Sequence, residues 1–252
     1  MPSVELISIT PVKCFRLAHP HSIELTETGV REDRRFVLVD GDDRRLRSSL
    51  TSWPQPLRAD YDAGREQLRI SFPDGTELEE GALGSGEPRE IDFHGRVVRC
   101  HVVEGTWNER LSELARRPVR LMRPLEQREM RSNPVTLVST ASVERLAEEA
   151  GERVDGRRFR MLFTLSGCRA HEEDEWEGRL LRIGGAIVRA GGPVDRCAMT
   201  TRDPDTGERD LDTLHLIKEY RGTSDRGTID FGVYGAVERP GRVSVGDPVE
   251  LV

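Results

Sequence analysis

Short runs of aliphatic and β-branched residues recur along most of this chain, and turn-forming residues separate them. In the first half such runs occupy residues 4–10, 34–40, 67–72 and 90–103, and the groups DGDD and PDGT follow two of them. Runs of this length bounded by Gly, Pro and Asp are typical of β-strands. Many short strands at such spacing favour a barrel or a sandwich.

Three segments carry a helical spacing of apolar residues instead. They are residues 106–115, 141–151 and 211–222. The first opens with Thr106 and has Glu109 three residues later, which predicts a capping box. The other two end at glycine, which predicts a helix stop at each.

Strands return towards the end of the chain. A two-glycine turn joins two short apolar runs within residues 180–190, which predicts a hairpin, and residues 231–252 have the pattern of a closing meander. We therefore expect a mainly β protein with a few helices (α+β). We also expect two domains, at residues 1–105 and 106–252.

Charge and composition exclude several classes of function. The 252 residues carry a formal net charge of −7, which argues against nonspecific binding to nucleic acid or to a membrane surface. No apolar run approaches the roughly 18 residues of a membrane helix, and the start lacks the layout of a signal peptide. The four cysteines form no CxxC pair, so neither a zinc ribbon nor a thioredoxin-like motif is expected. We expect a cytoplasmic protein without disulfides.

Several ligand-binding motifs fail on their spacing. The chain has no GxxxxGK[ST] and no GxGxxG after a strand, which excludes a P-loop and a Rossmann fingerprint. HEEDEW, at residues 171–176, lacks the HExxH spacing, and an acidic surface loop is the simpler interpretation. The acidic turn that begins at Asp203 has Glu208 and Leu214 where a calcium loop needs Gly and Glu.

One constellation survives, around Cys197 in the segment GPVDRCAMTT. The guanidinium of the preceding residue would lower the pKa of the thiol, and thiolates suit soft or high-valent metals. Thr200 and Thr201 offer hydroxyls to an oxo or phosphate group. Lys13, in PVK, and Arg34, in REDRR, add positive charge. The residues alone leave two alternatives open: an anionic-cofactor site with a thiolate, or a structural Cys197 buried in the core.

The segment RCAMTTRDPDTGERDLDTL, at residues 196–214, resembles the signature of the MOSC domain family, named from the C-terminal domain of molybdenum-cofactor sulfurases. Residues 159–186 resemble the part that precedes this signature. Residues 7–15 and 24–40 resemble the N-terminal β-barrel domain that accompanies MOSC domains. The resemblance covers nearly the whole chain. It implies a MOSC-type β-barrel preceded by a smaller N-terminal β-barrel-like domain.

The resemblance extends to the mitochondrial amidoxime-reducing component and implies a molybdenum cofactor (molybdopterin). It implies that Cys197 is catalytic and ligates molybdenum, as the motif cysteine does in those relatives. Leu162 stands where relatives have an asparagine contact. Cys14 stands where relatives commonly have serine, and Asp195 where some have serine. The residues that the resemblance places at cofactor-binding positions are Lys13, Cys14, Arg34, Ser139, Thr140, Arg160, Asp195, Arg196 and Tyr234.

Two functions follow from the resemblance. The first is a molybdenum-dependent oxidoreductase that removes oxygen from an N-hydroxylated small-molecule substrate, with the chemistry supplied by the cofactor. No plant-type cysteine cluster follows residue 197, so the electrons would come from a separate donor protein. The second is a carrier that transfers sulfur or the cofactor, in which Cys197 holds a persulfide. Neither function involves nucleic acid or a membrane.

Overall fold

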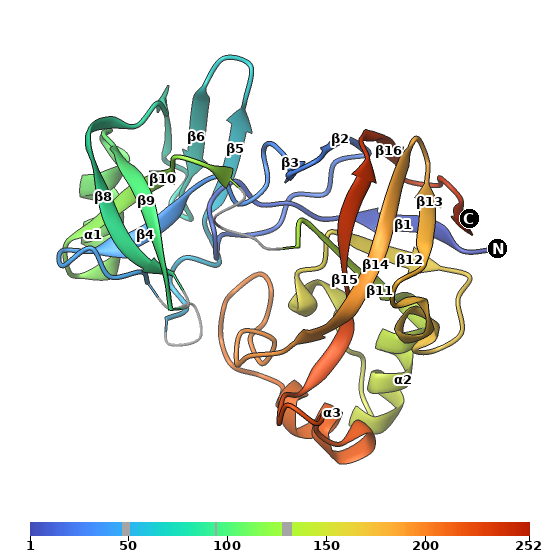
Figure 1. Cartoon of the computed structure of the whole chain (residues 1–252). Coiled ribbons are helices and arrows are strands. Elements are labelled where there is room, and N and C mark those ends of the chain that lie inside the picture. Colours follow the sequence, from blue (N-terminus) through green and yellow to red (C-terminus); the bar gives the residue numbers. More distant parts are fainter. Residues whose placement is uncertain (47–50, 94, 128–132) are drawn as a thin grey trace.

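The computed structural model describes residues 1–46, 51–93, 95–127 and 133–252, and this part of the chain is mainly β (Figure 1). Its strands form one sheet of seven strands, one of four and two of three. Helices cover one end of the seven-stranded sheet and a flank of the four-stranded one. The predicted mainly β class with a few helices is confirmed.

The seven-stranded sheet is a nearly closed barrel. Its strands, in order across the sheet, are β1 (Ser3–Ile7), β12 (Phe163–Ser166), β11 (Val135–Ser139), β15 (Asp230–Arg239), β14 (Ala186–Asp195), β13 (Leu180–Ile183) and β17 (Val249–Leu251). At the seam, Val4 N donates to Asp247 O at 2.9 Å and Val249 N donates to Pro2 O at 2.8 Å. These bonds join the first strand to the last, so the sheet curves back on itself and leaves little free edge.

Alternate residues of these strands point into the barrel and form its core. Leu137, Phe163, Leu165 and Val188 are fully buried there, and Val233 is nearly so. Burying such side chains stabilises a fold by about 1.5–3 kcal/mol each. The alternation of buried and partly exposed positions is the period-two pattern expected from the sequence.

A second lobe, which we call the N-terminal lobe, contains most of the remaining strands. The four-stranded sheet has β4 (Val37–Asp40), β10 (Val119–Pro124), β9 (Arg96–Val103) and β8 (Ser85–Phe93), and a three-stranded sheet has β5 (Arg58–Asp62), β6 (Gln67–Ser71) and β7 (Glu77–Gly81). One core fills the space between the two sheets and helix α1 (Trp107–Ala115). It includes Phe36, Leu68, Trp107 and Leu121.

The chain passes between the two lobes more than once. β1 pairs with β12, and β2 (Ser22–Thr26) pairs with both β3 (Gly29–Val30) and β16 (Gly241–Ser244). β10 lies after α1 in sequence, yet it pairs with β4 and β9. The domain boundary between residues 105 and 106 stays a prediction.

Two further α-helices, α2 (Thr140–Ala150) and α3 (Thr213–Arg221), lie at one end of the barrel, and the chain also forms short 3-10 turns η2 (Gly156–Phe159) and η3 (Glu172–Trp176). The predicted stop at Gly151 is confirmed by its left-handed backbone, with φ of 67°. None of the helices in the described ranges is both long and apolar enough to cross a membrane.

The predicted capping box at the start of α1 is wrong. The Thr106 side chain makes no cap within its own helix. Its hydroxyl and its backbone N–H donate instead to the Glu80 carboxylate on β7. A tertiary partner has therefore replaced the local one.

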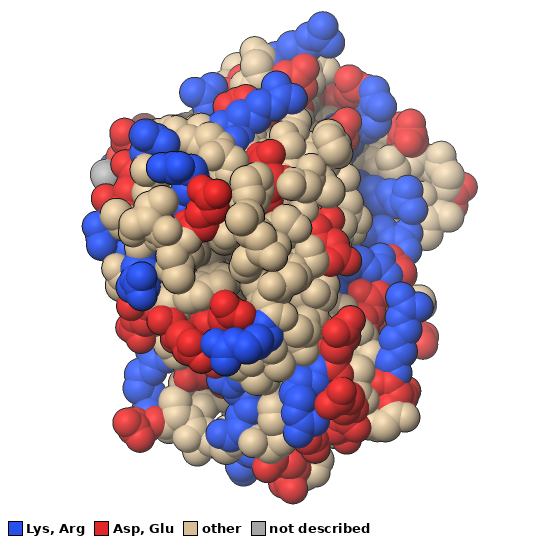
Figure 2. Space-filling view, turned by 90° about the vertical axis from the view of Figure 1, so that its right-hand side faces the viewer, with Lys and Arg blue, Asp and Glu red and all other residues tan. Residues whose placement is uncertain are grey.

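Charged side chains are mixed over the face that Figure 2 draws, where acidic and basic groups lie next to one another. Cross-strand pairs such as Arg189 with Glu238, at 2.7 Å, also bring opposite charges together. Exposed pairs of this kind add little stability. Where positive and negative charges alternate on a surface, there is no extended positive region that would attract a polyanion.

We expect Leu165→Ala to destabilise the barrel by about 2–5 kcal/mol, because it leaves a cavity in a close-packed core. Leu165 is 0% exposed, whereas Leu83 is 66% exposed and provides the same substitution at the surface. Urea unfolding of both variants checks this. Equal losses in the two would contradict the assignment of Leu165 to the barrel core.

Candidate functional site

A cavity of about 1580 Å³ lies between the two lobes. Turns at the ends of strands from both lobes line it. Eight of the ten residues predicted for the site line this cavity: Lys13, Cys14, Arg34, Arg160, Asp195, Arg196, Cys197 and Tyr234. Segments that are far apart in sequence therefore meet at one hollow.

Lys13 and Cys14 occupy the two central positions of a tight turn. Phe15 N donates to Val12 O at 3.2 Å, and Cys14 has a φ of 80°. A positive φ at the third position of a turn favours Gly or Asn, so a cysteine there is strained. The turn presents both side chains to the cavity.

The Lys13 ammonium lies over the Phe93 ring, 4.3 Å from its centroid. Burial lowers the pKa of Lys13 to about 8, and the nearby charges of Arg45 and Arg34 add to this effect. Within the described ranges no carboxylate forms an ion pair with Lys13. An ammonium group in these surroundings favours a bound anion.

Arg34 joins the N-terminal segment to the turn that follows η2. Its Nη1 donates to Asp33 Oδ2 at 2.5 Å and its Nη2 donates to Arg160 O at 2.8 Å. Asp33 is fully buried and accepts a further bond from Thr10 N at 2.7 Å. The carboxylate therefore holds Arg34 in place at the cavity wall.

Arg160 completes this link, since its Nη2 donates to Phe15 O at 2.6 Å. Burial, together with the neighbouring charge of Arg34, lowers the pKa of Arg160 to about 10. Arg160 therefore stays positively charged near pH 7, and it lies close to Arg34. Their charge adds to that of Lys13 at the same cavity.

Cys197 follows the end of β14 and is exposed. The alternative that it is a buried core thiol is therefore wrong. Arg196, directly before it, is directed elsewhere: Nε donates to Phe231 O at 2.8 Å, and Nη1 donates to Phe159 O at 3.0 Å. Burial lowers the pKa of Arg196 to about 10. Arg196 therefore anchors the segment that presents Cys197.

The two threonines after Cys197 shape the turn that carries the thiol. Thr200 Oγ1 donates to Cys197 O at 3.1 Å, and Thr201 Oγ1 donates to Ala198 O at 2.8 Å. Both hydroxyls thus satisfy carbonyl groups of their own turn. The expected donation to an oxo or phosphate group is not part of this arrangement.

Asp195 and Tyr234 lie on the neighbouring strands β14 and β15 and line the cavity beside Cys197. The pKa of the Tyr234 hydroxyl is raised by burial and by the Asp195 carboxylate, to which it hydrogen-bonds. Gly232, two residues before Tyr234, has a φ of 72°, and a Cβ there would lie 2.6 Å from Leu137 O. The glycine of the FGVY segment is therefore required by close packing.

Ser139 and Thr140 are not among the described residues that line the cavity. Ser139 is fully buried and caps α2, where its side chain accepts from Ser142 N at 3.1 Å. Thr140 Oγ1 donates to Leu165 O at 3.2 Å. The structure gives these two residues contacts at the start of a helix.

Sequence reasoning missed several residues that line the cavity. Arg45 and Phe93 come from the N-terminal lobe, and the Arg45 guanidinium lies 4.9 Å from the Phe93 centroid. Met161 lines the cavity, whereas Leu162, which replaces an asparagine of relatives, is buried in the barrel core. In a chain with many arginines, no local signal separates Arg45 from solvated ones.

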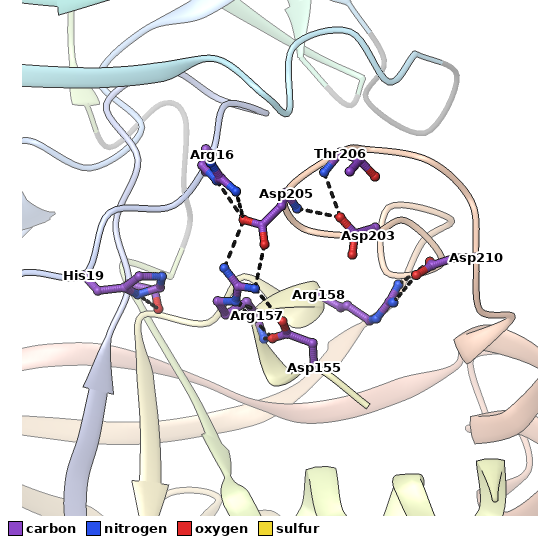
Figure 3. Close-up of polar contacts among 10 residues, drawn as sticks. Arg16, His19, Asp155, Arg157, Arg158, Asp203, Asp205, Thr206 and Asp210 are labelled. Atoms are coloured by element: carbon purple, nitrogen blue, oxygen red, sulfur yellow. Dashed lines mark hydrogen bonds and ion pairs between the residues drawn. The ribbon is translucent and has the colours of Figure 1, made fainter. Parts of the chain in front are cut away.

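An ion-pair network fastens the acidic turn after Cys197 to both sides of the cavity (Figure 3). Asp205 accepts from Arg16 Nε at 2.7 Å and from Arg157 Nη2 at 2.9 Å. Arg157 also binds Asp155. Arg16 lies two residues after Cys14. The Asp205 carboxylate therefore joins three stretches of the chain, each of which lies next to residues that line the cavity.

A second ion pair supports the same turn. Arg158 Nη1 donates to Asp210 Oδ1 at 2.7 Å and its Nη2 donates to Asp210 Oδ2 at 2.5 Å (Figure 3). Within the turn, Asp203 Oδ1 accepts from the backbone N–H groups of Asp205 and Thr206. Bidentate pairs of this kind fix direction as well as distance.

The side chains at this cavity suit a metal ion that arrives with most of its ligands supplied by a cofactor. In the part of the chain that the structure describes, no group of three or more His, Cys, Asp or Glu side chains is placed to hold a metal ion. One exposed thiol and several cationic groups face the cavity. A soft or high-valent metal carried by an anionic cofactor matches these groups.

The chain is similar to several known proteins. Residues 124–250 match the MOSC domain. Mitochondrial amidoxime-reducing component 1 of Mus musculus is 34% identical over 151 residues, which cover 52% of this chain and 44% of that protein. The protein of the same name from Danio rerio is 30% identical over 277 residues, covering 99% of this chain and 81% of that protein. The chain thus spans less than half the length of the mouse protein.

Among solved structures, the YUAD protein from Bacillus subtilis matches with a TM-score of 0.45 and 14% sequence identity. The match covers 100% of this chain and 96% of that one.

We expect Asp205→Asn to lower stability by about 1 kcal/mol, because two partly exposed ion pairs lose their carboxylate. The hydrogen bond from Arg157 lowers the pKa of Asp205. The stability that Asp205 contributes is therefore present at pH values above the ordinary carboxyl pKa. It is lost as the pH falls through the lowered pKa that Asp205 has in the folded chain. Urea unfolding from about pH 7 to about pH 3 measures this. Asp60→Asn, at an exposed site, is the control; identical curves for both variants would contradict the role of Asp205.

We expect Lys13→Met to stabilise the protein near pH 7 by at least about 1 kcal/mol, because it removes a buried charge. The pKa of Lys13 is lower in the folded chain than in the unfolded chain. Between about pH 8 and about pH 10, Lys13 holds its proton in the unfolded chain but has released it in the folded chain. The free energy of unfolding of the wild type therefore rises with pH across this range. Lys218→Met replaces the other lysine, on α3, and is the control for urea unfolding. A Lys13→Met curve parallel to that control would contradict the burial of this ammonium.

Proposed function

Because this chain belongs to the MOSC domain family, we propose that it binds a molybdenum cofactor and reduces N-hydroxylated small molecules. One observation carries the proposal. The exposed thiol of Cys197 shares a cavity with Lys13, Arg34 and Arg160, from segments far away in the sequence. A thiol beside a cluster of positive charge suits a metal with an anionic tail.

The cationic residues would hold the cofactor through its phosphate. Lys13 offers a compact charge with no carboxylate partner among the described residues, and Arg34 offers a planar fork fixed by Asp33. Charge-assisted hydrogen bonds to a phosphate are about twice as strong as neutral ones. The bound anion would also offset the repulsion between Arg34 and Arg160.

Cys197 would supply the protein's ligand to molybdenum. When bound, the cofactor supplies the exchange of two electrons with the substrate. The chain's part is to present the thiol in a fixed direction, which Arg196 and the Thr200 hydroxyl do by bonding to carbonyl oxygens around it.

Tyr234, with Asp195 beside it, would deliver protons to the substrate. Reduction of an N–OH group to N–H consumes two electrons and two protons and releases water. The raised pKa of Tyr234 keeps its hydroxyl protonated near neutral pH, and the Asp195 carboxylate, to which it hydrogen-bonds, would orient this hydroxyl. Their place on the strands beside Cys197 suits delivery to the leaving oxygen.

The names of the relatives support the class of substrate. Both are called amidoxime-reducing components, and we carry this activity to the present chain as a proposal. A separate protein would deliver the electrons. The cytoplasmic location stays a prediction, since the mitochondrial names belong to the relatives.

A carrier function is the second candidate, and the exposure of Cys197 favours it. The exposed Cys197 thiol would take the outer sulfur from a donor persulfide and become a persulfide itself, while the donor is released as a thiol. Cys197 would then pass this sulfur on to an acceptor. This function needs the thiol but not a retained metal.

We expect wild-type protein from a host that makes the cofactor to carry about one molybdenum per chain. We expect Cys197→Ser to lose most of the metal or of the amidoxime reduction measured with a chemical electron donor. Elemental analysis and mass spectrometry of fresh protein check this.

Cys168→Ser is the matched control, because Cys168 is half-buried away from the cavity and burial raises the pKa of its thiol to about 12. Metal-free wild-type protein with an added sulfur on Cys197 would support the carrier. Metal-free protein without that sulfur would contradict both functions.

A further inference from the structure

A second cavity, of about 590 Å³, lies at the junction of the β2–β3 hairpin with the N-terminal lobe. It shares no lining residue with the cavity of Cys197. Arg34 and Arg35 are neighbours in sequence, yet Arg34 lines the first cavity and Arg35 lines the second. The proposed function uses only Arg34.

Arg35 is largely buried at this second cavity. Its Nη1 donates to Pro124 O at 3.3 Å, which is long for a hydrogen bond, and its side chain also donates a hydrogen bond to the Tyr61 hydroxyl. In the stretches that the structure describes, no carboxylate forms an ion pair with Arg35. A guanidinium has five N–H donors, so several of them remain available to a ligand.

The carboxylate of Glu66, which lines this cavity, is already used by other groups. Arg123 donates to both of its oxygens, with Nη2 at 2.9 Å and Nη1 at 2.5 Å, and the Tyr61 hydroxyl donates to it as well. Among the described residues, the charge of Arg123 therefore has an ion-pair partner, whereas that of Arg35 has none. Burial, followed by the nearby charge of Arg123, lowers the pKa of Arg35.

The rim of the cavity adds further donors and charge. Arg31 is exposed there, and Thr28 brings a hydroxyl group. Three arginines (Arg31, Arg35 and Arg123) and two glutamates (Glu27 and Glu66) line the cavity, which gives it a net charge of 3 − 2 = +1 in a chain whose net charge is −7.

We propose that this second cavity binds a small organic anion, whose phosphate or carboxylate group takes the free donors of Arg35 and Arg31. Arginine forks match both kinds of group. The volume lies within the range of about 300–1000 Å³ that small-molecule sites occupy, so the ligand is of nucleotide size rather than a bare ion. The ligand would connect the β2–β3 hairpin with β5 and β10, which carry Tyr61 and Arg123.

The probes are adenosine monophosphate and citrate, which carry a phosphate and carboxylates, and titration calorimetry measures their binding to the whole chain. We expect Arg35→Gln to bind the better probe at least about tenfold more weakly at this site, since it removes charge-assisted bonds. Arg31→Gln, an exposed change that leaves the core intact, should weaken binding less. Arg58→Gln, at an exposed site that lines neither cavity, should bind as wild type does.

Lys13→Met separates the two cavities, because it alters only the first. Binding that survives in Lys13→Met and weakens at least about tenfold in Arg35→Gln supports the second site, whatever the molybdenum content shows. Equal binding in Arg35→Gln and wild type, loss of all binding in Lys13→Met, or no binding of either probe to wild type would overturn the proposal.

Discussion

Buried guanidinium groups that donate to backbone carbonyl oxygens connect the segments around the Cys197 cavity. Arg34 bonds to Arg160 O, and Arg160 bonds to Phe15 O. Arg196 bonds to Phe159 O and Phe231 O. Each bond joins parts of the chain that are distant in sequence. Because a buried guanidinium needs acceptors for its donors, each arginine keeps its turn in one position.

This arrangement also concentrates positive charge in a protein that is acidic overall. The chain has a net charge of −7, and acidic and basic groups alternate on the face shown in Figure 2. Lys13, Arg34 and Arg160 nevertheless meet at one cavity, whose described lining residues include nine basic and six acidic side chains. Net charge thus says little about the ligand, since the field inside a cavity depends on which side chains line it.

Local patterns predicted the elements well where the deciding contacts are local. The glycine stop of α2 depends on the backbone of one residue, and Gly151 has the expected positive φ. The cap at Thr106 failed because Glu80, 26 residues away, competes for the same hydroxyl. Likewise, Ser139 and Thr140 lie close in sequence to cavity residues but bond to α2 and β12 instead.

The sequence by itself determined the mainly β class, through its alternating apolar runs, and it identified Cys197, Lys13 and Arg34 through short motifs. Only the tertiary structure decided that Cys197 is exposed, that Arg196 anchors its segment, and that Arg34 and Arg35 serve separate cavities. The reason is physical. A strand pattern depends on neighbours along the chain, whereas the surroundings of an arginine depend on which distant carbonyl or carboxylate the fold brings within reach of its long side chain.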